Sequence, residues 1–405
     1  MAHDPHAIRR ERIERLLGEC MAARGIDLWL VYTRESSRDP LGWDVGLDQV
    51  VARSAGLFSL RDGVLTRDAI VASYDTSPVE VSGIYQSVTP YRSEGITPHL
   101  EAAFARLAPR KVALDVSRDM PVADGLTHGM RLHLDEVLGP RLGEVAVSSE
   151  PLVVTFRCRK LPGELEALER AVLLTQDALR RVLTADVVRA GTTRELDVAD
   201  FLVRATEAGG AKLSFCHVMV GPCRGHSEPT ERVIQAGDLL RIDFGVFVDG
   251  YTSDIQRTAY VLSSGESGPP EAVARLFETT LRANRAGIDA LRPGARGRDV
   301  DAKARAVFVE AGYEEYPHAA GHPIGLEVHE LGPTLGPPWK ERYGSSVDHL
   351  IEPGMVFAVE PMAYPEIPDC GGVVHLGLEE DVVVTPDGPR IIGTPQDELV
   401  LIPHP

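Results

Sequence analysis

Apolar and polar positions in the first 150 residues alternate between helical and strand-like spacing. Apolar side chains recur at helical spacing over residues 8–24, and Gly25 ends that segment. Short apolar runs then predict strands at 27–32, 63–73 and 111–117 and a helix at 100–108. This alternation predicts a small α/β domain of about 150 residues, a usual domain size.

The pattern changes near residue 155. Pro151 and Pro162–Gly163 interrupt the chain, and a long helical pattern opens at Glu164. The segments that follow are expected as helices at 164–184, 194–208, 270–291 and 297–311, and as strands at 239–261, 355–362 and 377–385. Helices combined with antiparallel hairpins indicate the α+β class. The sequence therefore predicts two domains, residues 1–155 and 156–405.

The composition narrows the classes of partner. The chain is 43% hydrophobic and 25% charged and has a formal net charge of -18, which argues against nucleic acid or an anionic membrane. Its N-terminal segment carries charges where a signal peptide needs an apolar run, and no stretch is long enough to cross a membrane. Five cysteines without CxxC spacing suggest reduced thiols. We therefore expect a cytoplasmic protein.

Two carboxylates are prominent in GDLLRIDFGVFVDGYTSDIQRTAYV, residues 237–261. Two apolar runs flank Asp249–Gly250, which predicts a two-residue hairpin turn. In that register Asp243 lies opposite Gln256, and Asp254 is its diagonal neighbour on the same face, about 7–8 Å away at the backbone. Both carboxylates can then reach one centre.

Carboxylates that face each other on apolar strands repel unless a cation lies between them. A metal site at the hairpin is therefore one interpretation. The alternative is that one or both acids are exposed, or are paired with Arg241 or Arg257.

Further candidate ligands follow. His318, His322 and His329 are concentrated in EEYPHAAGHPIGLEVHELGP, residues 314–333, and Glu360 and Glu379 stand at the ends of apolar strands. Each glutamate needs a partner there, and a salt bridge is the simpler alternative. Carboxylates with one imidazole suit Mn²⁺, Co²⁺, Fe²⁺ or Zn²⁺ better than a Cys-rich zinc site. Such carboxylates can bridge two metal ions that hold a hydroxide.

Four motifs occur in the order RIDFG…GYTSDIQRT, GHPIGLEVHE, GMVFAVEP and GLEEDVVVT. They resemble the signatures of the pita-bread metallopeptidases, which include aminopeptidase P, prolidase and methionine aminopeptidase. The resemblance covers about residues 155–395. It implies a pita-bread catalytic domain over 156–405, preceded over 1–155 by a smaller α/β domain like that of creatinase and prolidase.

The resemblance also implies a ligand set for two divalent metal ions, with manganese expected and cobalt, zinc or iron as other options. The implied ligands are Asp243, Asp254, His322, Glu360 and Glu379. Glu379 is preferred to Glu380 by counting back from Thr385, and Glu380 is expected to point to the other face of the strand.

The resemblance assigns further roles to four side chains. His226 is implied to contact the substrate near the attacked carbonyl, and His329 to stabilise the tetrahedral intermediate. His318 matches a histidine of the substrate site. Glu360 is implied to accept and return the proton of a metal-bridging hydroxide that attacks the scissile carbonyl.

The implied activity is that of an exopeptidase that cleaves before proline in short peptides, as a Xaa-Pro dipeptidase or aminopeptidase, and a homodimer is expected. Two positions depart from the motifs: Gln256 replaces a threonine, and Gly377 stands where an arginine is often found. They leave a strict requirement for proline open.

Three alternatives remain open. The first is a pita-bread hydrolase that acts on a non-peptide substrate or on a specialised amide or ester. The second is a metal-free hydrolase like creatinase, against which the complete five-ligand set argues. The third is a non-catalytic binding module on the same fold.

Overall fold

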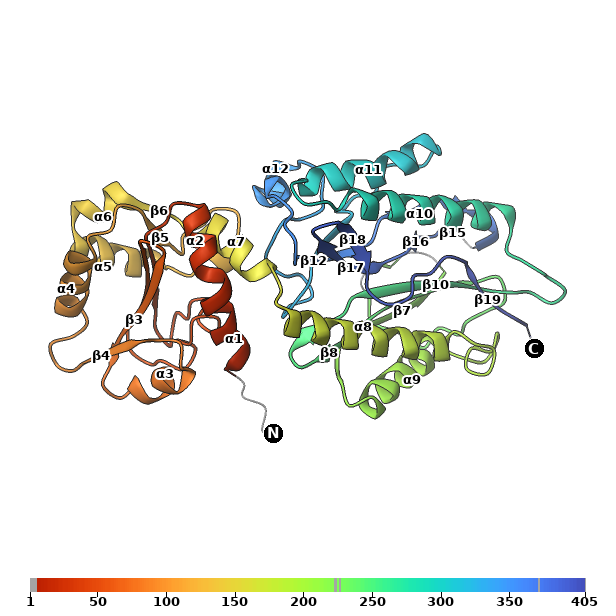
Figure 1. The fold of residues 1–405 in the computed structure, drawn as a ribbon. Coiled ribbons are helices and arrows are strands. Elements are labelled where there is room, and N and C mark those ends of the chain that lie inside the picture. Colours follow the sequence, from red (N-terminus) through yellow and green to blue (C-terminus); the bar gives the residue numbers. More distant parts are fainter. Residues whose placement is uncertain (1–5, 222–223, 226, 371, 405) are drawn as a thin grey trace. The chain divides into compact units, whose positions relative to one another are not determined.

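The computed structural model describes residues 6–221, 224–225, 227–370 and 372–404 (Figure 1). The chain forms two compact units, of which the first ends at Arg157 and the second begins at Cys158.

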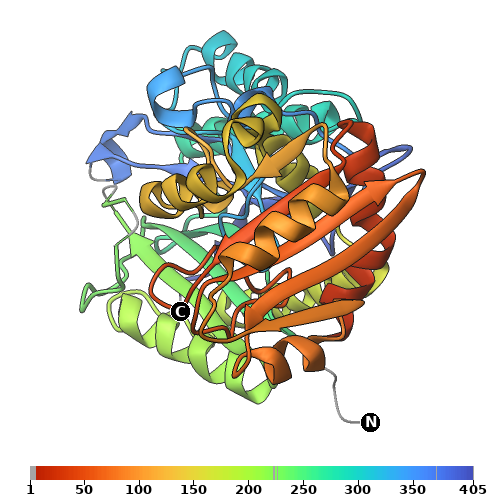
Figure 2. The ribbon, with the colours of Figure 1, turned by 90° about the vertical axis from the view of Figure 1, so that its left-hand side faces the viewer.

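The first unit contains a six-stranded mixed sheet in the order β4-β3-β2-β1-β5-β6, coloured from red through orange to yellow in Figure 2. Its strands are β1 (Leu28–Thr33), β2 (Ser54–Arg61), β3 (Val64–Ala72), β4 (Ser87–Tyr91), β5 (Val112–Leu114) and β6 (Ala146–Ser148). The strand β2 runs antiparallel to both of its neighbours, β1 and β3, and the other neighbouring pairs are parallel. The predicted strands at 27–32, 63–73 and 111–117 are therefore confirmed as β1, β3 and β5.

The helices of the first unit bury their apolar faces against this sheet. They are α1 (Ala7–Arg12), α2 (Gly18–Ala23), α3 (Thr76–Ser82), α4 (Thr97–Leu107), α5 (His128–Leu138), α6 (Pro140–Val145) and α7 (Glu150–Cys158). A π-helical turn, Ile13–Leu17, joins α1 to α2, so the predicted helix over 8–24 is confirmed. Leu100 and Phe104 of α4 belong to the core formed with β1, β2 and β3.

The second unit is built on two antiparallel ladders. One has the order β19-β10-β8-β7, with β9 paired to β8, and the other has the order β11-β12-β17-β18. The strands of the first are β7 (Lys212–Val220), β8 (Leu239–Val248), β9 (Tyr251–Thr252), β10 (Ile255–Val261) and β19 (Val400–Ile402), of which β19 alone runs parallel to its neighbour. The strands of the second are β11 (Gly321–Pro323), β12 (Val356–Val359), β17 (Glu380–Thr385) and β18 (Gly388–Ile391).

Four short strands complete the β structure of this unit in two pairs. They are β13 (Met362–Ala363) with β16 (Leu376–Gly377), and β14 (Glu366–Ile367) with β15 (Gly372–Val373). The helices are α8 (Pro162–Val182), α9 (Glu195–Ala208), α10 (Glu271–Ala290), α11 (Gly297–Glu310) and α12 (Lys340–Tyr343). In Figure 1, α8 and α9 lie along one side of the unit and α10 and α11 along the other, with the strands between them.

The second unit repeats one arrangement. Two long helices and then antiparallel strands occur as α8, α9, β7, β8 and β10, and again as α10, α11, β11, β12 and β17. Asn284 of α10 ties the second set together, because its Nδ2 donates to the carbonyl oxygens of Val359 (2.8 Å) and Leu378 (3.1 Å). The predicted α+β class is confirmed for this unit.

The hairpin forms as its turn residues predict. Asp249 and Gly250 both have positive φ, 51° and 89°, as a tight two-residue turn of this kind requires. Val248 pairs with Tyr251, and Asp243 pairs with Gln256, so the predicted register is confirmed.

Three predicted strands are wrong in one respect, because each is interrupted. The strand after the turn stops at Thr252 and resumes at Ile255, the strand predicted at 355–362 is split between β12 and β13, and the strand predicted at 377–385 is split between β16 and β17. Asp254, Glu360 and Glu379 lie in these three interruptions. Among the helices of the described ranges, none combines the length and the apolar content needed to cross a bilayer.

Candidate metal centre

The five ligands expected from the sequence line a single cavity of about 250 Å³ in the second unit. Of the residues that the structure describes, nine form its wall: Phe215, His217, Asp243, Asp254, His322, Val328, His329, Glu360 and Glu379. The structure thus brings together acids from β8 and from the neighbourhood of β10, β12 and β17, and one histidine from β11.

Three of the four acids stand in breaks between strands. Asp254 lies between β9 and β10, Glu360 between β12 and β13, and Glu379 between β16 and β17. At two of these breaks the backbone amide of the acid has a defined acceptor. The amide of Asp254 donates to Oδ2 of Asp381 at 3.0 Å, and that of Glu360 to the carbonyl of Ala320 at 2.8 Å. The breaks therefore hold the acids in defined places.

The side chains converge on His322. Its Nε2 lies 3.4 Å from Oδ2 of Asp254 and 3.7 Å from Oε1 of Glu360. One ligand atom each of Asp254, His322 and Glu379 lies within 4.8 Å of the others. Nδ1 of His322 lies 3.2 Å from the carbonyl of Pro323, so a proton on Nδ1 leaves the lone pair of Nε2 directed at the acids.

Carboxyl groups of the site are buried and close to one another, and both effects raise the pKa values of Asp243, Glu360 and Glu379. Burial, followed by the charge of Asp254, raises the pKa of Asp243 to about 7. Burial also raises the pKa of Glu360 to about 8, although His322 opposes the shift. The pKa of Glu379 lies well above its usual range because the carboxyl is buried and faces Asp254 and Glu360.

His322 responds to the same acids. Burial disfavours its charged form, but the hydrogen bond to Asp254 and the charge of Glu360 outweigh burial and raise its pKa to about 9. The acids of the site therefore stabilise a positive charge placed among them.

These residues fit a divalent cation. Oε2 of Glu379 is buried and has no hydrogen-bond partner among the residues that the structure describes. A buried carboxylate oxygen without a donor is costly, and a metal ion satisfies it. Oxygen donors with one imidazole also match the preference of Mn²⁺, Fe²⁺, Co²⁺ and Zn²⁺.

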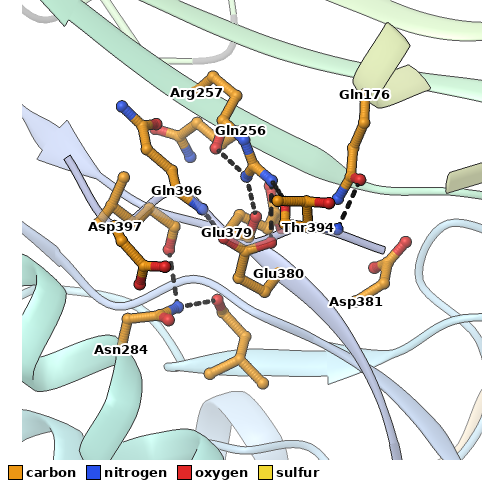
Figure 3. Close-up of polar contacts among 12 residues, drawn as sticks. Gln176, Gln256, Arg257, Asn284, Glu379, Glu380, Asp381, Thr394, Gln396 and Asp397 are labelled. Atoms are coloured by element: carbon orange, nitrogen blue, oxygen red, sulfur yellow. Dashed lines mark hydrogen bonds and ion pairs between the residues drawn. The ribbon is translucent and has the colours of Figure 1, made fainter. Parts of the chain in front are cut away.

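Glu379 and Glu380 face opposite ways. Glu379 lines the cavity, whereas Oε2 of Glu380 accepts a hydrogen bond from Nη2 of Arg257 at 2.9 Å (Figure 3). Arg257 also donates to the backbone oxygens of Gln256 and Glu379. The guanidinium of Arg257 is therefore bound to Glu380 and to backbone oxygens, so it does not neutralise the acids of the cavity.

Arg241 behaves differently. Its Nη1 lies 3.8 Å from Oδ2 of Asp243, so the pairing considered from the sequence exists as a long contact. Arg241 lowers the pKa of Asp243, but burial and Asp254 prevail. One arginine therefore does not neutralise the cluster.

The remaining candidate histidines have different surroundings. The ring centres of His329 and His322 are 4.3 Å apart, and His329 lines the cavity beside the acids. His318 lines an adjoining cavity of about 350 Å³, and its Nδ1 is 2.7 Å from the carbonyl of Ala319. His226 lies outside the described residues.

Sequence reasoning missed two residues of the cavity wall on β7. His217 pairs directly with Asp243 across the ladder, and Phe215 stands beside it with a ring distance of 5.7 Å. The register with β8 identifies them, but no strand was expected at 212–220.

Comparison with known proteins gives a consistent result. A family model described as metallopeptidase family M24 matches residues 166–386. The chain is 33% identical over 285 residues to an uncharacterized peptidase, YqhT, of Bacillus subtilis, which covers 69% of this chain and 73% of that protein. It is 30% identical over 258 residues to a Xaa-Pro dipeptidase of Pyrococcus furiosus, at 62% and 67% coverage.

The structure is also similar to a solved one. A Xaa-Pro dipeptidase from Bacillus anthracis superposes with a TM-score of 0.67 and 26% identity, covering 98% of this chain and 100% of that one. The similarity therefore includes both units, and the two-unit pita-bread architecture expected from the sequence is confirmed.

Proposed function

Because this chain belongs to metallopeptidase family M24, we propose that it hydrolyses the bond before proline in short peptides, as a Xaa-Pro dipeptidase or aminopeptidase. The proposal assigns catalysis to residues 156–405 and a two-ion centre to five ligands: Asp243, Asp254, His322, Glu360 and Glu379. The relatives named Xaa-Pro dipeptidase support the substrate class.

The observation that carries the proposal is the shared cavity. Four acids and one histidine from separate strands line it, and no described basic side chain neutralises all of them. Four carboxylates balance the charge of two divalent ions. When bound, such ions supply Lewis acidity toward a carbonyl oxygen and lower the pKa of water.

The protein's own groups supply the rest of the chemistry. Glu360 is proposed to accept a proton and to return it to the leaving amine, since its carboxylate lines the cavity together with the other acids. His329 stands beside the acids, where its imidazole can donate to the developing oxyanion. His318 borders the adjoining cavity and contacts the substrate there. His226 is assigned to the substrate near the attacked carbonyl, as the motif order implies.

The test is hydrolysis by protein reconstituted with Mn²⁺, Co²⁺ or Zn²⁺. The panel contains Xaa-Pro dipeptides, longer Xaa-Pro peptides and matched Xaa-Ala peptides. We expect cleavage of Xaa-Pro bonds and loss of activity in a chelator. Cleavage of Xaa-Ala with no preference for proline would reject the substrate assignment, and full activity in the chelator would reject the metal centre.

We also propose manganese as the metal, a homodimer and a cytoplasmic location. The acidic composition and the sparse cysteines support the location, and the resemblance of the motifs supports the dimer. Light scattering on the purified protein tests the dimer, and metal analysis after expression without added metal tests manganese.

A further inference from the structure

A second cavity, of about 350 Å³, adjoins the metal centre and shares His322, His329 and Glu360 with it. Arg241 lines this second cavity. It stands on β8 two residues before Asp243, so strand alternation puts both side chains on the same face. A permanently charged guanidinium therefore borders the space next to the metal centre.

Arg241 is only 5% exposed, and its hydrogen-bonding capacity is little used. Nη1 donates to Oε1 of Gln256 at 3.4 Å and lies 3.8 Å from Asp243, and the buried Nε has no partner among the described residues. A guanidinium has five N–H donors, and a buried charge with few close partners is costly. The site therefore favours an anion that enters the cavity and accepts two parallel bonds.

Gly377 makes this position of the arginine possible. A Cβ at residue 377 would lie 2.8 Å from Oε1 of Gln256 and 2.9 Å from Cε of Met362. A side chain there would displace the amide that accepts the bond from Arg241. Gly377 and Gln256 together therefore hold the guanidinium in place.

The other acid on the wall of this cavity does not compete for Arg241. The two carboxylate oxygens of Glu330 accept bonds from the backbone amides of Leu326 (3.1 Å) and Leu331 (2.9 Å). A carboxylate brought by a ligand therefore meets an arginine whose strong bonds are still available.

We propose that Arg241 binds the α-carboxylate of the substrate and thereby selects dipeptides over longer or amidated peptides. This inference rests on the proposed peptidase function. Arg241 lines the cavity that shares His322, His329 and Glu360 with the metal centre, so a carboxylate bound to it lies close to the cleaved bond. In a dipeptide this carboxylate is the C-terminus, whereas an amidated or longer peptide has no charge at that position.

The test compares substrates that differ only at that carboxylate. We would measure kcat/KM for Ala-Pro, Ala-Pro-amide and Ala-Pro-Ala in the wild type, Arg241→Gln and Arg241→Lys. A bond to a charged group predicts that the wild type prefers the free dipeptide by about 10- to 100-fold. Arg241→Gln should bring this ratio close to one, and Arg241→Lys should retain part of it, since lysine keeps the charge without the planar fork.

Arg342→Gln is the matched control. Arg342 lines the same cavity, but its guanidinium stacks on Trp339 and Tyr343. The ratio of free to amidated substrate should survive in this variant. If Arg342→Gln removes the preference while Arg241→Gln keeps it, Arg241 is not the carboxylate site. Metal content is measured in each variant, and any shared effect of lost metal cancels in the ratio.

Two further measurements separate this inference from the proposed function. Ala-Ala and Ala-Ala-amide test the carboxylate preference even when proline is not required. Calorimetric titration of the metal-free protein with the same pair gives a result without turnover. The free dipeptide should bind more tightly to the wild type and equally to Arg241→Gln. Equal binding of acid and amide by the wild type would overturn the inference, whatever the outcome with Xaa-Pro peptides.

Discussion

Nε2 of His322 lies 3.4 Å from Oδ2 of Asp254, although His322 belongs to β11 and Asp254 to the break before β10. The contact joins the two repeated halves of the second unit at the candidate metal centre. An imidazole nitrogen and a carboxylate oxygen at this distance can be two ligands of one ion.

Replacement of His322 should therefore remove metal and activity together. We expect His322→Ala to lose at least one ion per chain and nearly all turnover, because a buried ligand is deleted and its acids are left facing one another. Elemental analysis and peptide hydrolysis measure the two effects. A His322→Ala protein with full metal content would contradict the ligand assignment.

His329 should behave in the opposite way. It is proposed to donate to the substrate and not to hold metal, so His329→Ala should keep about the wild-type metal content. The loss of one oxyanion donor costs about 100- to 1,000-fold in kcat. Metal analysis, melting temperature and kcat on one preparation check this expectation, and His226→Ala is predicted to give the same pattern. Unchanged kcat with a lower melting temperature would instead mean that His329 is a packing residue.

Without metal, the stability of the protein should decrease as the pH rises. The buried carboxyls of Asp243 and Glu360 have pKa values raised to about 7 and about 8, so the folded metal-free protein keeps protons that the unfolded chain releases near pH 4. Its free energy of unfolding therefore falls as the pH rises from about 4 to about 8. The raised pKa of His322 acts in the same direction, because its stabilisation is complete below pH 6.5 and is lost as the pH rises through about 9.

Melting curves with and without chelator, between pH 5 and pH 9, measure this effect. We expect the metal-free protein to lose about 5–10 °C over the range. Metal-bound protein should lose less, because the ions compensate the ionised acids. A metal-free protein that becomes more stable with rising pH would show that these acids are not confined together.

Gly245→Ala should disturb the centre without touching a ligand. A Cβ at Gly245 would lie 2.3 Å from the carbonyl oxygen of Ser253 and 2.6 Å from Cε1 of Phe215. Ser253 directly precedes Asp254, so relief of the clash moves that ligand. We expect a destabilisation of about 1–3 kcal/mol in denaturant unfolding and weaker metal binding.

The matched control is Gly163→Ala in the first turn of α8, where a Cβ meets no atom within 4 Å. Its stability and metal content should equal or exceed those of the wild type. Equal metal affinity in both variants would show that Asp254 tolerates movement of the hairpin.

The hairpin was predictable because its signals are local. Asp249–Gly250 specifies a tight turn, and the turn fixes the register that brings Asp243 opposite Gln256. The interruption at Asp254 was not predictable, because it depends on a bond to Asp381, far along the chain. The register of the hairpin is thus set by the residues of its own turn. The interruption at Asp254 is set by a hydrogen bond to a residue of the second ladder.

The strand β7 shows the opposite case. Its first half is exposed or only half-buried, while Val218, Met219 and Val220 are all buried in succession. The segment therefore lacks the alternation that identifies a strand. His217 was missed for this reason, since only pairing with β8 places it against Asp243.

The partners of the two arginines could not be decided from the sequence either. Arg241 and Arg257 both lie on strands of the hairpin, and either could neutralise an acid there. In the structure Arg257 donates a hydrogen bond to Glu380, whereas Arg241 lines the cavity. That difference arises from β17, which meets the hairpin only after the chain has folded.

The division of the ligands between two halves has a consequence for synthesis. A growing chain displays Asp243 and Asp254 early, but the break that carries Glu379 is made only after α10, α11 and β12. Under the proposed assignment, a fragment that ends before Glu379 lacks one of the five ligands. Peptidase activity is therefore expected only after the residues up to Glu379 have been synthesised.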